Sequence, residues 1–362
     1  MGLFLAAMNV HGRAEDAKIR VAIAEGIPKV VITGENLNAT EAGHHRFSEK
    51  ELEITARKNG IEMMGKVFKG PLRVKGDGDA IYVDGRQYRG ELAVYGGRDG
   101  LLVVDELPLE TYLIGLINAE AHSSWPMESL KAQAVAARSY ALFRLKSSRT
   151  KAFDLRATVA DQVYLGSSLE DSAAAQAVES TRGEVVSYNG AVAETFYHST
   201  CGGRTAGVGE VWGGNLPYLK SVECDWCQES PRYFWRYETD FEEIGAALQS
   251  DGINVGPVSG IEIVSKTPSG RNDVIKIEGE KGARMIKAAV LRKAIGYTKL
   301  FSTLFEVFEP EEGKFLFLGR GSGHGVGMCQ WGARGLALND KSHSEILLYY
   351  YPGCAIINAY PD

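Results

Sequence analysis

The sequence predicts an α+β protein with a β-rich amino-terminal region and a mixed body of helices and strands. Two observations predict this fold class. From residue 18 to about residue 106, short apolar runs alternate with Gly, Asn and Asp, as is typical of antiparallel strands. From residue 107 to residue 362, apolar residues recur at helical spacing in several segments, with strand-like runs between them. We therefore expect a β-rich region over 18–106 and a mixed body over 107–362.

Three helices are expected after strands at residues 19–23, 30–33, 80–83 and 92–95. The first begins near Pro108, because proline suits the first turn and apolar residues recur at positions 109, 112, 113, 116 and 117. The second follows Pro126 and is rich in strong helix formers. The third spans residues 169–181 and is closed by Gly183, a suitable left-handed cap.

Strands return at residues 184–188 and 192–197. An insert from about residue 240 to residue 300 follows. It contains a helix over 241–248, a strand pair near Ile261 and Val274, and a short helix over 288–295. We interpret this insert as a peripheral lobe of the mixed body.

Charge and hydropathy argue against two classes of partner. The chain has 40 Lys and Arg residues against 46 Asp and Glu residues and no basic run, so nothing predicts nucleic-acid binding. No segment reaches the ~18 consecutive apolar residues of a membrane span. Residues 1–17 begin with an apolar stretch and resemble the end of a secretion signal without its basic front, so we expect an exported protein.

Four residues have the spacing of a metal site. His198 and Cys201 form one pair, and Cys224 and Cys227 form a second pair after 22 intervening residues. Each pair offers two donors from one turn, as a tetrahedral zinc ion requires. Because a catalytic zinc keeps an open position for water, a set of four predicts a structural site. Zinc is the commoner occupant of such spacing, and iron is the other option.

Two alternatives to this structural site stay open. The four residues could instead form one disulfide with two bystanders. A zinc-dependent hydrolase would require one of the four ligands to leave the ion and make room for water. Cys329 and Cys354 lie outside the set and are expected as free thiols or, in an oxidising compartment, as a disulfide.

Glu120 is the candidate general acid. It follows the apolar residues of the first helix at spacings of three, four, seven and eight residues, so it lies on their face of the helix. A carboxyl group held against Leu116, Ile117 and Trp125 loses solvation, which favours its protonated form. The alternative is an ordinary exposed glutamate near the end of a helix.

Four motifs follow one another along the chain. They are Glu106-Leu-Pro-Leu-Glu-Thr-Tyr-Leu-Ile-Gly, Trp125-Pro-Met-Glu-Ser-Leu-Lys-Ala-Gln-Ala-Val-Ala-Ala-Arg-Ser-Tyr, Tyr197-His-Ser-Thr-Cys-Gly-Gly-Arg-Thr and Gly323-His-Gly-Val-Gly-Met-Cys-Gln-Trp-Gly-Ala. Together they resemble the SpoIID/LytB family, over a stretch from about Tyr88 to the carboxyl end. Some members of that family carry zinc bound by Cys and His near this region, which agrees with a structural metal.

The resemblance implies a lytic transglycosylase that cleaves the β-1,4 bond between N-acetylmuramic acid and N-acetylglucosamine of peptidoglycan strands. The family's essential glutamate lies just before its lysine-alanine-glutamine helix, and Glu120 matches it. That glutamate protonates the bridging oxygen and then takes the proton of the muramic acid C6 hydroxyl, which closes a 1,6-anhydro ring. A two-carboxylate hydrolase would need a partner, for which Asp154, Asp161 and Glu194 are unplaced candidates.

The segment Gly319-Arg-Gly-Ser-Gly-His-Gly-Val-Gly has alternate glycines, which let backbone approach a ligand closely. It lacks the glycine order and the Lys-Ser/Thr ending of nucleotide-binding loops. By resemblance, the motif that contains His324 and Gln330 lines the glycan cleft, where His324 donates to a sugar or orients Glu120. The alternative is a glycine-rich turn with a structural histidine.

Five further polar residues are expected to line the sugar groove. Each has an alternative role: Arg138 could pair with a carboxylate to brace the fold, and Tyr140 could pack beneath the second helix. The five are Gln133, Arg138, Tyr140, Gln162 and Tyr164.

A second function stays open beside the enzyme. The LytB branch of the family resembles modifiers that bind glycan and recruit or stimulate a cell-wall amidase without cleaving anything. Retention of Glu120 favours the enzyme. The sequence leaves open whether the glycan must first lose its stem peptides, and whether the protein serves sporulation, division or wall turnover.

Overall fold

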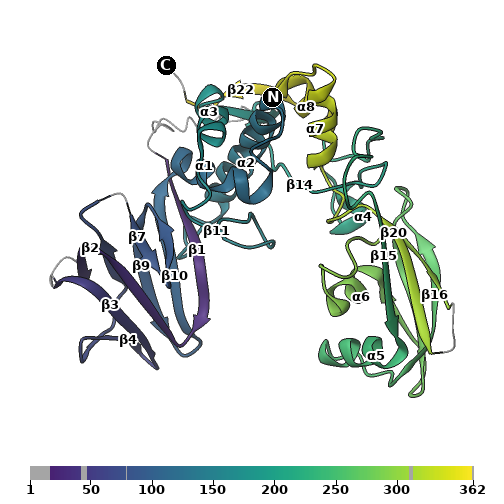
Figure 1. Ribbon diagram of the computed structural model, residues 1–362, viewed down its shortest axis with the longest axis horizontal. Coiled ribbons are helices and arrows are strands. Elements are labelled where there is room, and N and C mark those ends of the chain that lie inside the picture. Colours follow the sequence, from purple (N-terminus) through teal and green to yellow (C-terminus); the bar gives the residue numbers. More distant parts are fainter. Residues whose placement is uncertain (1–16, 42–46, 79, 310–312, 361–362) are drawn as a thin grey trace, which may run out of the picture. The chain divides into compact units, whose positions relative to one another are not determined.

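A computed structural model of the protein describes residues 17–41, 47–78, 80–309 and 313–360 (Figure 1). The described residues mix helices and strands, which confirms the predicted α+β class. They form two compact units: the first holds residues 17–123, 137–185 and 356–360, and the second holds 124–136 and 186–355. The expected boundary near residue 106 falls inside the first unit. The expected remnant of a secretion signal lies outside the described residues, apart from Ala17.

The β-rich region belongs to the first unit and forms one large sheet. Its strand order is β11-β1-β10-β9-β6-β2-β3-β4-β5, with β7 beside β2 and β8 beside β7. β1 pairs antiparallel with β10, from Lys18↔Pro108 onward, and parallel with β11. The strands are β1 (Lys18–Ile27), β2 (Lys29–Glu41), β3 (Phe47–Arg57), β4 (Gly60–Met63), β5 (Lys66–Phe68), β6 (Leu72–Lys75), β7 (Ile81–Val83), β8 (Arg86–Tyr88), β9 (Glu91–Gly97), β10 (Gly100–Pro108) and β11 (Leu155–Arg156).

The three helices predicted by apolar spacing are confirmed. α1 (Leu109–Glu120) follows Pro108 and buries the apolar residues of its predicted face. α2 (Met127–Ser147) follows Pro126, and its residues from 137 onward belong to the first unit. α3 (Ser172–Ser180) packs against α1 and begins at Asp171, whose carboxylate accepts a hydrogen bond from the Ala174 N–H at 2.8 Å. No helix among the described residues combines the length and the apolar character that crossing a bilayer requires.

A buried ion pair joins α1 to α2 within the first unit. The Arg138 side chain is fully buried, and its Nε and Nη2 donate to the two carboxylate oxygens of Glu110 at 2.8 and 2.7 Å. The same guanidinium donates to the carbonyl oxygens of Val178 and Glu184. Tyr360 donates a further hydrogen bond to Glu110 at 2.5 Å. Arg138 therefore braces the fold through a carboxylate, which is the alternative to sugar contact.

We expect Arg138→Met to destabilise the protein by about 3–5 kcal/mol, because it leaves the Glu110 carboxylate buried without its cation. Chemical denaturation measures the change. Arg89→Met is the matched control, since the pair of Arg89 with Glu170 is partly exposed and its loss should cost no more than about 1 kcal/mol. Equal losses for the two variants would contradict the bracing role.

The second unit consists of a lobe and of short strands and helices outside that lobe. β14 and β21 pair in parallel, with Tyr197 opposite Met328 and His198 opposite Cys329. The elements outside the lobe are β13 (Ala191–Val192), β14 (Tyr197–His198), α4 (Val208–Val211), β21 (Met328–Cys329), α7 (Gln330–Leu338) and α8 (His343–Tyr350). β12 (Glu184–Tyr188) and β22 (Ala355–Asn358) each have residues in both units.

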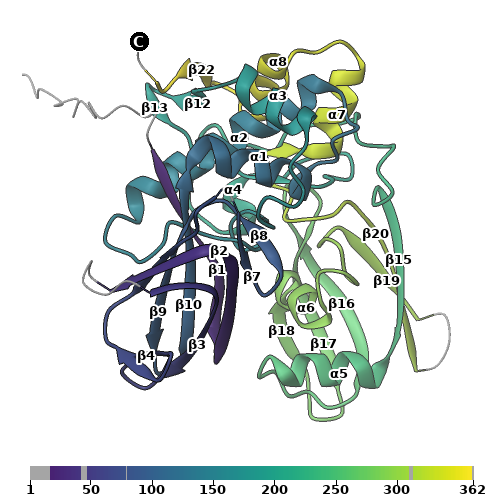
Figure 2. The same ribbon diagram turned by 60° about the vertical axis from the view of Figure 1, so that its left-hand side comes forward.

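The lobe, residues 234–320, has its own core of buried apolar residues. α5 contacts β16 and α6 contacts β17, so both helices cover the sheet β16-β17-β18 (Figure 2). A second sheet has the order β15-β20-β19. The lobe elements are β15 (Phe234–Asp240), α5 (Phe241–Ser250), β16 (Val258–Lys266), β17 (Asn272–Gly279), β18 (Arg284–Lys287), α6 (Ala288–Ile295), β19 (Phe305–Phe308) and β20 (Lys314–Arg320).

The lobe confirms the helices and the strand pair expected within the insert, but it extends further at both ends. β15 and β20 pair antiparallel from Phe234↔Arg320 to Asp240↔Lys314, so strands on either side of the expected insert close it. A ladder between such distant strands leaves no local signal in the sequence.

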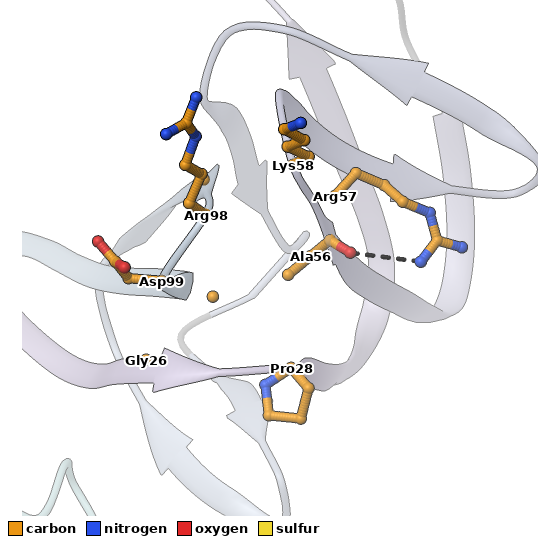
Figure 3. Close-up of a pocket in the computed structure, with 9 residues that line it drawn as sticks. Gly26, Pro28, Ala56, Arg57, Lys58, Arg98 and Asp99 are labelled. Atoms are coloured by element: carbon orange, nitrogen blue, oxygen red, sulfur yellow. Dashed lines mark hydrogen bonds between the residues drawn. The ribbon is translucent and has the colours of Figure 1, made fainter.

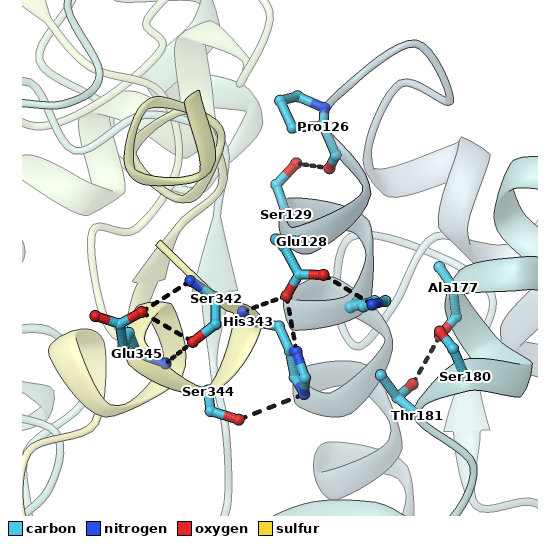
Figure 4. A network of polar contacts seen from close by, with 11 residues as sticks. Pro126, Glu128, Ser129, Ala177, Ser180, Thr181, Ser342, His343, Ser344 and Glu345 are labelled. Atoms are coloured by element: carbon cyan, nitrogen blue, oxygen red, sulfur yellow. Dashed lines mark hydrogen bonds and ion pairs between the residues drawn. The ribbon is translucent and has the colours of Figure 1, made fainter. Parts of the chain in front are cut away.

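A polar network in the second unit joins the start of α2 to the start of α8 (Figure 4). Glu128 accepts hydrogen bonds from the backbone N–H of His343 at 2.8 Å and from Lys131 at 2.7 Å, and its Oε2 lies 2.9 Å from Nδ1 of His343. Burial alone would raise the pKa of Glu128, but these hydrogen bonds outweigh it and lower that pKa to about 2. The carboxylate therefore stabilises the folded state in its charged form.

This lowered pKa predicts a pH-dependent contribution to stability. The contribution is fully present above the unfolded pKa of about 4.5 and is lost as the pH falls toward the folded value of about 2. We expect the stability difference between the parent and Glu128→Gln to shrink steadily from pH 5 to pH 2, as measured by urea denaturation. His343→Ala should remove part of the same stabilisation. The double variant should therefore lose less free energy of unfolding than the two single variants lose in sum. A difference that does not change with pH would contradict the assignment.

Candidate functional site

The Glu120 carboxyl group lies at the last residue of α1, half-buried and fixed by backbone. Its Oε1 accepts a hydrogen bond from the Val163 N–H at 2.6 Å. The preceding apolar face of α1 is buried, and Ala121 leaves the helix in an extended conformation. The sequence predicted the helix and the face, whereas the contact with Val163 comes from a loop that is 43 residues away in sequence.

The loop that holds Glu120, residues 161–164, is itself anchored by three of the predicted sugar-groove residues. Tyr140 donates to Asp161 at 2.7 Å, and the Arg156 N–H donates to the other carboxylate oxygen of Asp161 at 3.0 Å. Gln162 accepts from Tyr112 at 3.0 Å. Tyr164 donates to the buried Asp105 at 3.1 Å. These hydrogen bonds fix the backbone that donates to Glu120.

Tyr112 lies beneath this loop and remains a hydroxyl donor. Burial raises the pKa of Tyr112 well above its ordinary value, and the negative charge of Glu120 raises it further. Gln162 completes the contact by donating from its Nε2 to the Ala137 carbonyl oxygen at 3.3 Å. The site around Glu120 is therefore an ordered polar shell within the first unit.

Gln133, His324 and Gln330 lie in the second unit and are engaged there. Gln330 donates to the Gln133 side-chain oxygen at 3.2 Å, and both side chains are buried. Nδ1 of His324 accepts from the Val326 N–H at 3.1 Å, and the ring lies 4.8 Å from that of Trp212. Burial lowers the pKa of His324 to about 4, so the ring is neutral at pH 7. Its contact with a sugar or with Glu120 stays a prediction.

At two positions near His324, neighbouring atoms leave room only for glycine. A Cβ on Gly325 would lie 2.5 Å from the Arg271 guanidinium, and one on Gly327 would lie 2.0 Å from the Phe196 carbonyl oxygen. Both glycines also have positive φ, near 88° and 71°. Side chains at these two positions would therefore clash with neighbouring parts of the second unit.

Four buried cysteines form the candidate metal site: Cys201, Cys224, Cys227 and Cys329, all with sulfurs within 4.8 Å of one another. Four sulfurs around a tetrahedral zinc, each about 2.3 Å from the ion, lie about 3.8 Å apart. The Sγ atoms of Cys201 and Cys227 are 3.5 Å apart, so the cluster fits a metal of this size. All five cysteines of the chain are free thiols, which excludes the disulfide alternatives in this structure.

The fourth member of this cluster corrects the predicted ligand set, because Cys329 takes the place expected for His198. Nδ1 of His198 lies 3.1 Å from the Val326 carbonyl oxygen, and burial lowers the pKa of this histidine well below its ordinary value. Cys329 instead accepts hydrogen bonds at its Sγ from the N–H groups of Cys201 and Gly332, at 3.2 and 3.3 Å. Cys329 is 128 residues from Cys201, so no spacing rule connects them.

The surroundings of the four sulfurs suit negative charge. The Tyr350 hydroxyl lies 3.1 Å from the Cys224 sulfur. Arg271 is only 2% exposed and donates to the carbonyl oxygens of Cys201 and Arg204 at 2.8 and 3.1 Å. Four thiolates around a divalent ion carry a net charge of about −2, which a buried guanidinium nearby offsets.

A hollow of about 450 Å³ in the first unit is a less suitable site (Figure 3). It lies between the turns at Gly26, Lys58 and Arg98, at one end of the large sheet. Within the residues described there, its charged side chains are those of Arg57, Lys58, Arg98 and Asp99. None of its lining residues is a buried acid or nucleophile.

Comparison with known proteins shows the family of the chain. The chain matches the model of the stage II sporulation protein family, SpoIID, over residues 97–188, which include Glu120 and the loop 161–164. It is 32% identical over 273 residues to stage II sporulation protein D of Bacillus subtilis (strain 168), covering 71% of this chain and 76% of that protein. The chain belongs to the SpoIID family.

Other relatives extend this SpoIID similarity. An uncharacterized protein of Brachyspira hyodysenteriae (strain ATCC 49526 / WA1) is 34% identical over 311 residues, which cover 86% of this chain and 81% of that protein. The amidase enhancer of Bacillus subtilis (strain 168) is 28% identical over 356 residues, which cover 84% of this chain and 49% of that protein. The model of a domain of unknown function, DUF8618, matches residues 210–327, a stretch that includes the whole lobe.

The corrected ligand set predicts different effects for two variants of this SpoIID protein. Cys329→Ala should abolish binding of one metal ion per chain, whereas His198→Ala should retain it, because His198 lies outside the sulfur cluster. Elemental mass spectrometry of the purified chains measures this. Cys354→Ala is the matched control, since Cys354 is a half-buried thiol outside the cluster. Loss of the metal from the His198 variant alone would restore the set predicted from spacing.

Proposed function

We propose that this protein is a lytic transglycosylase that cleaves peptidoglycan glycan strands, with Glu120 as general acid and then general base. The observation that carries the proposal is the half-buried Glu120 carboxyl group at the end of α1, held by the Val163 N–H at 2.6 Å. A fixed carboxyl group is what proton transfer to a glycosidic oxygen requires. Similarity to stage II sporulation protein D supports the assignment.

The reaction needs one carboxyl group and no water. Glu120 gives its proton to the oxygen that bridges N-acetylmuramic acid and N-acetylglucosamine, and the bond from that oxygen to the muramic acid C1 breaks. The resulting carboxylate takes the proton of the muramic acid C6 hydroxyl, whose oxygen then bonds to C1. The products are a shortened strand with a free C4 hydroxyl and a 1,6-anhydromuramic acid end. Glu120 finishes protonated, ready for the next cycle.

The engagement of the other carboxylates in the first unit supports this single-carboxyl route. Asp154 is buried and pairs with Arg20 at 2.6 Å. Asp161 accepts from Tyr140 and lies 3.3 Å from Arg144. Both hold loops together, so neither is a ready nucleophile. We assign Tyr140, Gln162 and Tyr164 as positioning residues for Glu120, and we leave Gln133, His324 and Gln330 as proposed glycan contacts.

We further propose that the four-cysteine cluster holds a structural zinc ion. The ion would join the segments that carry Cys201, the Cys224–Cys227 turn and Cys329, with four ligands and no position left for water. Burial raises the pKa of the Cys329 thiol, and hydrogen bonds with the neighbouring cysteines raise it further, so ion binding has to displace protons.

A second candidate function is that of an amidase modifier in the cell envelope. It is favoured by the 28% identity to the protein named amidase enhancer. In that case the chain binds glycan, recruits or stimulates a cell-wall amidase and cleaves nothing itself. Export to the envelope is common to both candidates.

The enzyme proposal predicts that Glu120→Gln lowers glycan cleavage at least about 100-fold, the lower range for loss of a general acid. Mass spectrometry of products from purified peptidoglycan, with and without stem peptides, should find 1,6-anhydromuramic acid ends with the parent chain only. Glu179→Gln, which alters an exposed glutamate on α3, should retain full activity.

The same assay separates the two candidates. If the parent chain binds glycan but releases no anhydro ends from either substrate, the enzyme proposal fails. Release of stem peptides that rises when the chain is added to a purified cell-wall amidase would then establish the modifier.

A further inference from the structure

The lobe of the second unit carries a groove of about 1080 Å³, here called the lobe groove. It lies over the outer face of β15 and β20, at the end where these strands meet the Gly202–Gly203 turn and the Ser269–Gly270 turn. Its volume slightly exceeds the range of roughly 300–1,000 Å³ that is typical of ligand sites. All its lining residues belong to the second unit.

The floor of the lobe groove combines exposed apolar and cationic side chains. Phe234 is 70% exposed and Leu318 is 43% exposed, although both are large hydrophobic residues. Phe234 lies opposite Arg320 in the β15–β20 ladder, and Arg236 lies opposite Leu318. Each apolar side chain therefore has a cation directly across from it, on the same face of the sheet.

This face is held firmly from below. Trp235, which points to the other side of β15, is buried and donates from its Nε1 to the Gly321 carbonyl oxygen at 2.8 Å. A Cβ on Gly319 would lie 2.1 Å from the Trp235 ring, so the strands are in close contact there. Such packing fixes the direction in which Phe234 and Arg320 project.

The lobe groove carries charges of both signs, and four cationic side chains line it. Arg204, Arg236, Lys266 and Arg320 line it against two carboxylates, those of Asp225 and Glu306. Arg204 pairs with Glu223, and Arg236 lies 3.2 Å from Glu238. Among the described residues, Lys266 and Arg320 have no carboxylate within ion-pair distance, so both are available to an anionic ligand.

We propose that the lobe groove binds the stem peptide of peptidoglycan, a short peptide with several carboxylates and small apolar side chains. The carboxylates match Lys266 and Arg320, and the methyl groups match Phe234 and Leu318. A bare glycan backbone of uncharged sugars offers nothing to the two cations. The inference rests on peptidoglycan as the substrate in the proposed function, and it assigns to the lobe the recognition of strands that still carry peptides.

The test uses the full chain with Glu120→Gln, so that binding is measured without cleavage. Calorimetric titration with free stem peptide should show saturable binding that weakens as salt is raised, because the cations are exposed to solvent. The double change Lys266→Ala and Arg320→Ala should weaken binding about tenfold or more, as expected for loss of charge-assisted hydrogen bonds. Phe234→Ala should weaken it several-fold.

Each variant has a matched control in the same lobe. Arg284→Ala removes an exposed cation on β18, and Phe308→Ala removes a phenylalanine that is 44% exposed on β19. Neither residue lines the lobe groove, so both controls should bind as the parent does. Circular dichroism checks that every variant is folded.

Sedimentation with peptidoglycan sacculi completes the test. Sacculi that carry stem peptides should retain the chain, and sacculi stripped by an amidase should retain it less, with the difference absent in the groove variants. Equal retention, or no binding of free peptide, would overturn the inference. Tighter binding of polyglycerol phosphate, lost in the same variants, would also overturn it and assign the groove to a phosphate polymer.

The outcome is independent of glycan cleavage by the parent chain. Anhydro ends released from stripped strands without any stem-peptide binding would refute peptide binding by the lobe groove but support glycan cleavage by the chain. Stem-peptide binding without anhydro ends would support peptide binding by the lobe groove but refute glycan cleavage by the chain.

Discussion

Four buried sulfurs lie at one point of the second unit. They join the segment after β14, the Cys224–Cys227 turn and the start of α7, which lie up to 128 residues apart in sequence. The ladder that pairs two of these segments is short, since β14 and β21 have two residues each. Arg271 extends the connection to the lobe by donating to the Cys201 carbonyl oxygen. A metal bound here would therefore organise the glycine-rich segment and the lobe together.

The sequence predicted those features that depend on near neighbours. The helices α1 and α2 were predictable because their apolar faces and their prolines lie within a few turns of one another, and α3 was predictable from its alanines and the cap at Gly183. The site on α1 followed from the same spacing, which put Glu120 on the apolar face. Three of the four cluster cysteines were also found, because two donors within one turn leave a visible pattern.

Features that depend on long-range packing were missed for one physical reason. Cys329 replaces His198 in the cluster because the parallel pairing of β14 with β21 brings it there, and that pairing has no local signal. The ladder of β15 with β20 extended the lobe in the same way. Tyr140, Gln162 and Tyr164 also anchor one loop, and the sequence did not predict this role because their partners lie 21 to 59 residues away.

In the mechanism that we propose, the Glu120 carboxyl group has to act twice, and the loop at residues 161–164 suits this. A single-carboxyl mechanism needs Glu120 first as an acid and then as a base, so the contact that positions it should persist in both states. A cation at that place would favour the charged form and hinder the first step. The Val163 N–H is a neutral donor that carries no titrating proton, and an oxygen of either the acid or the carboxylate can accept from it. Anchoring that backbone through Tyr140, Gln162 and Tyr164 keeps the position fixed while the proton moves.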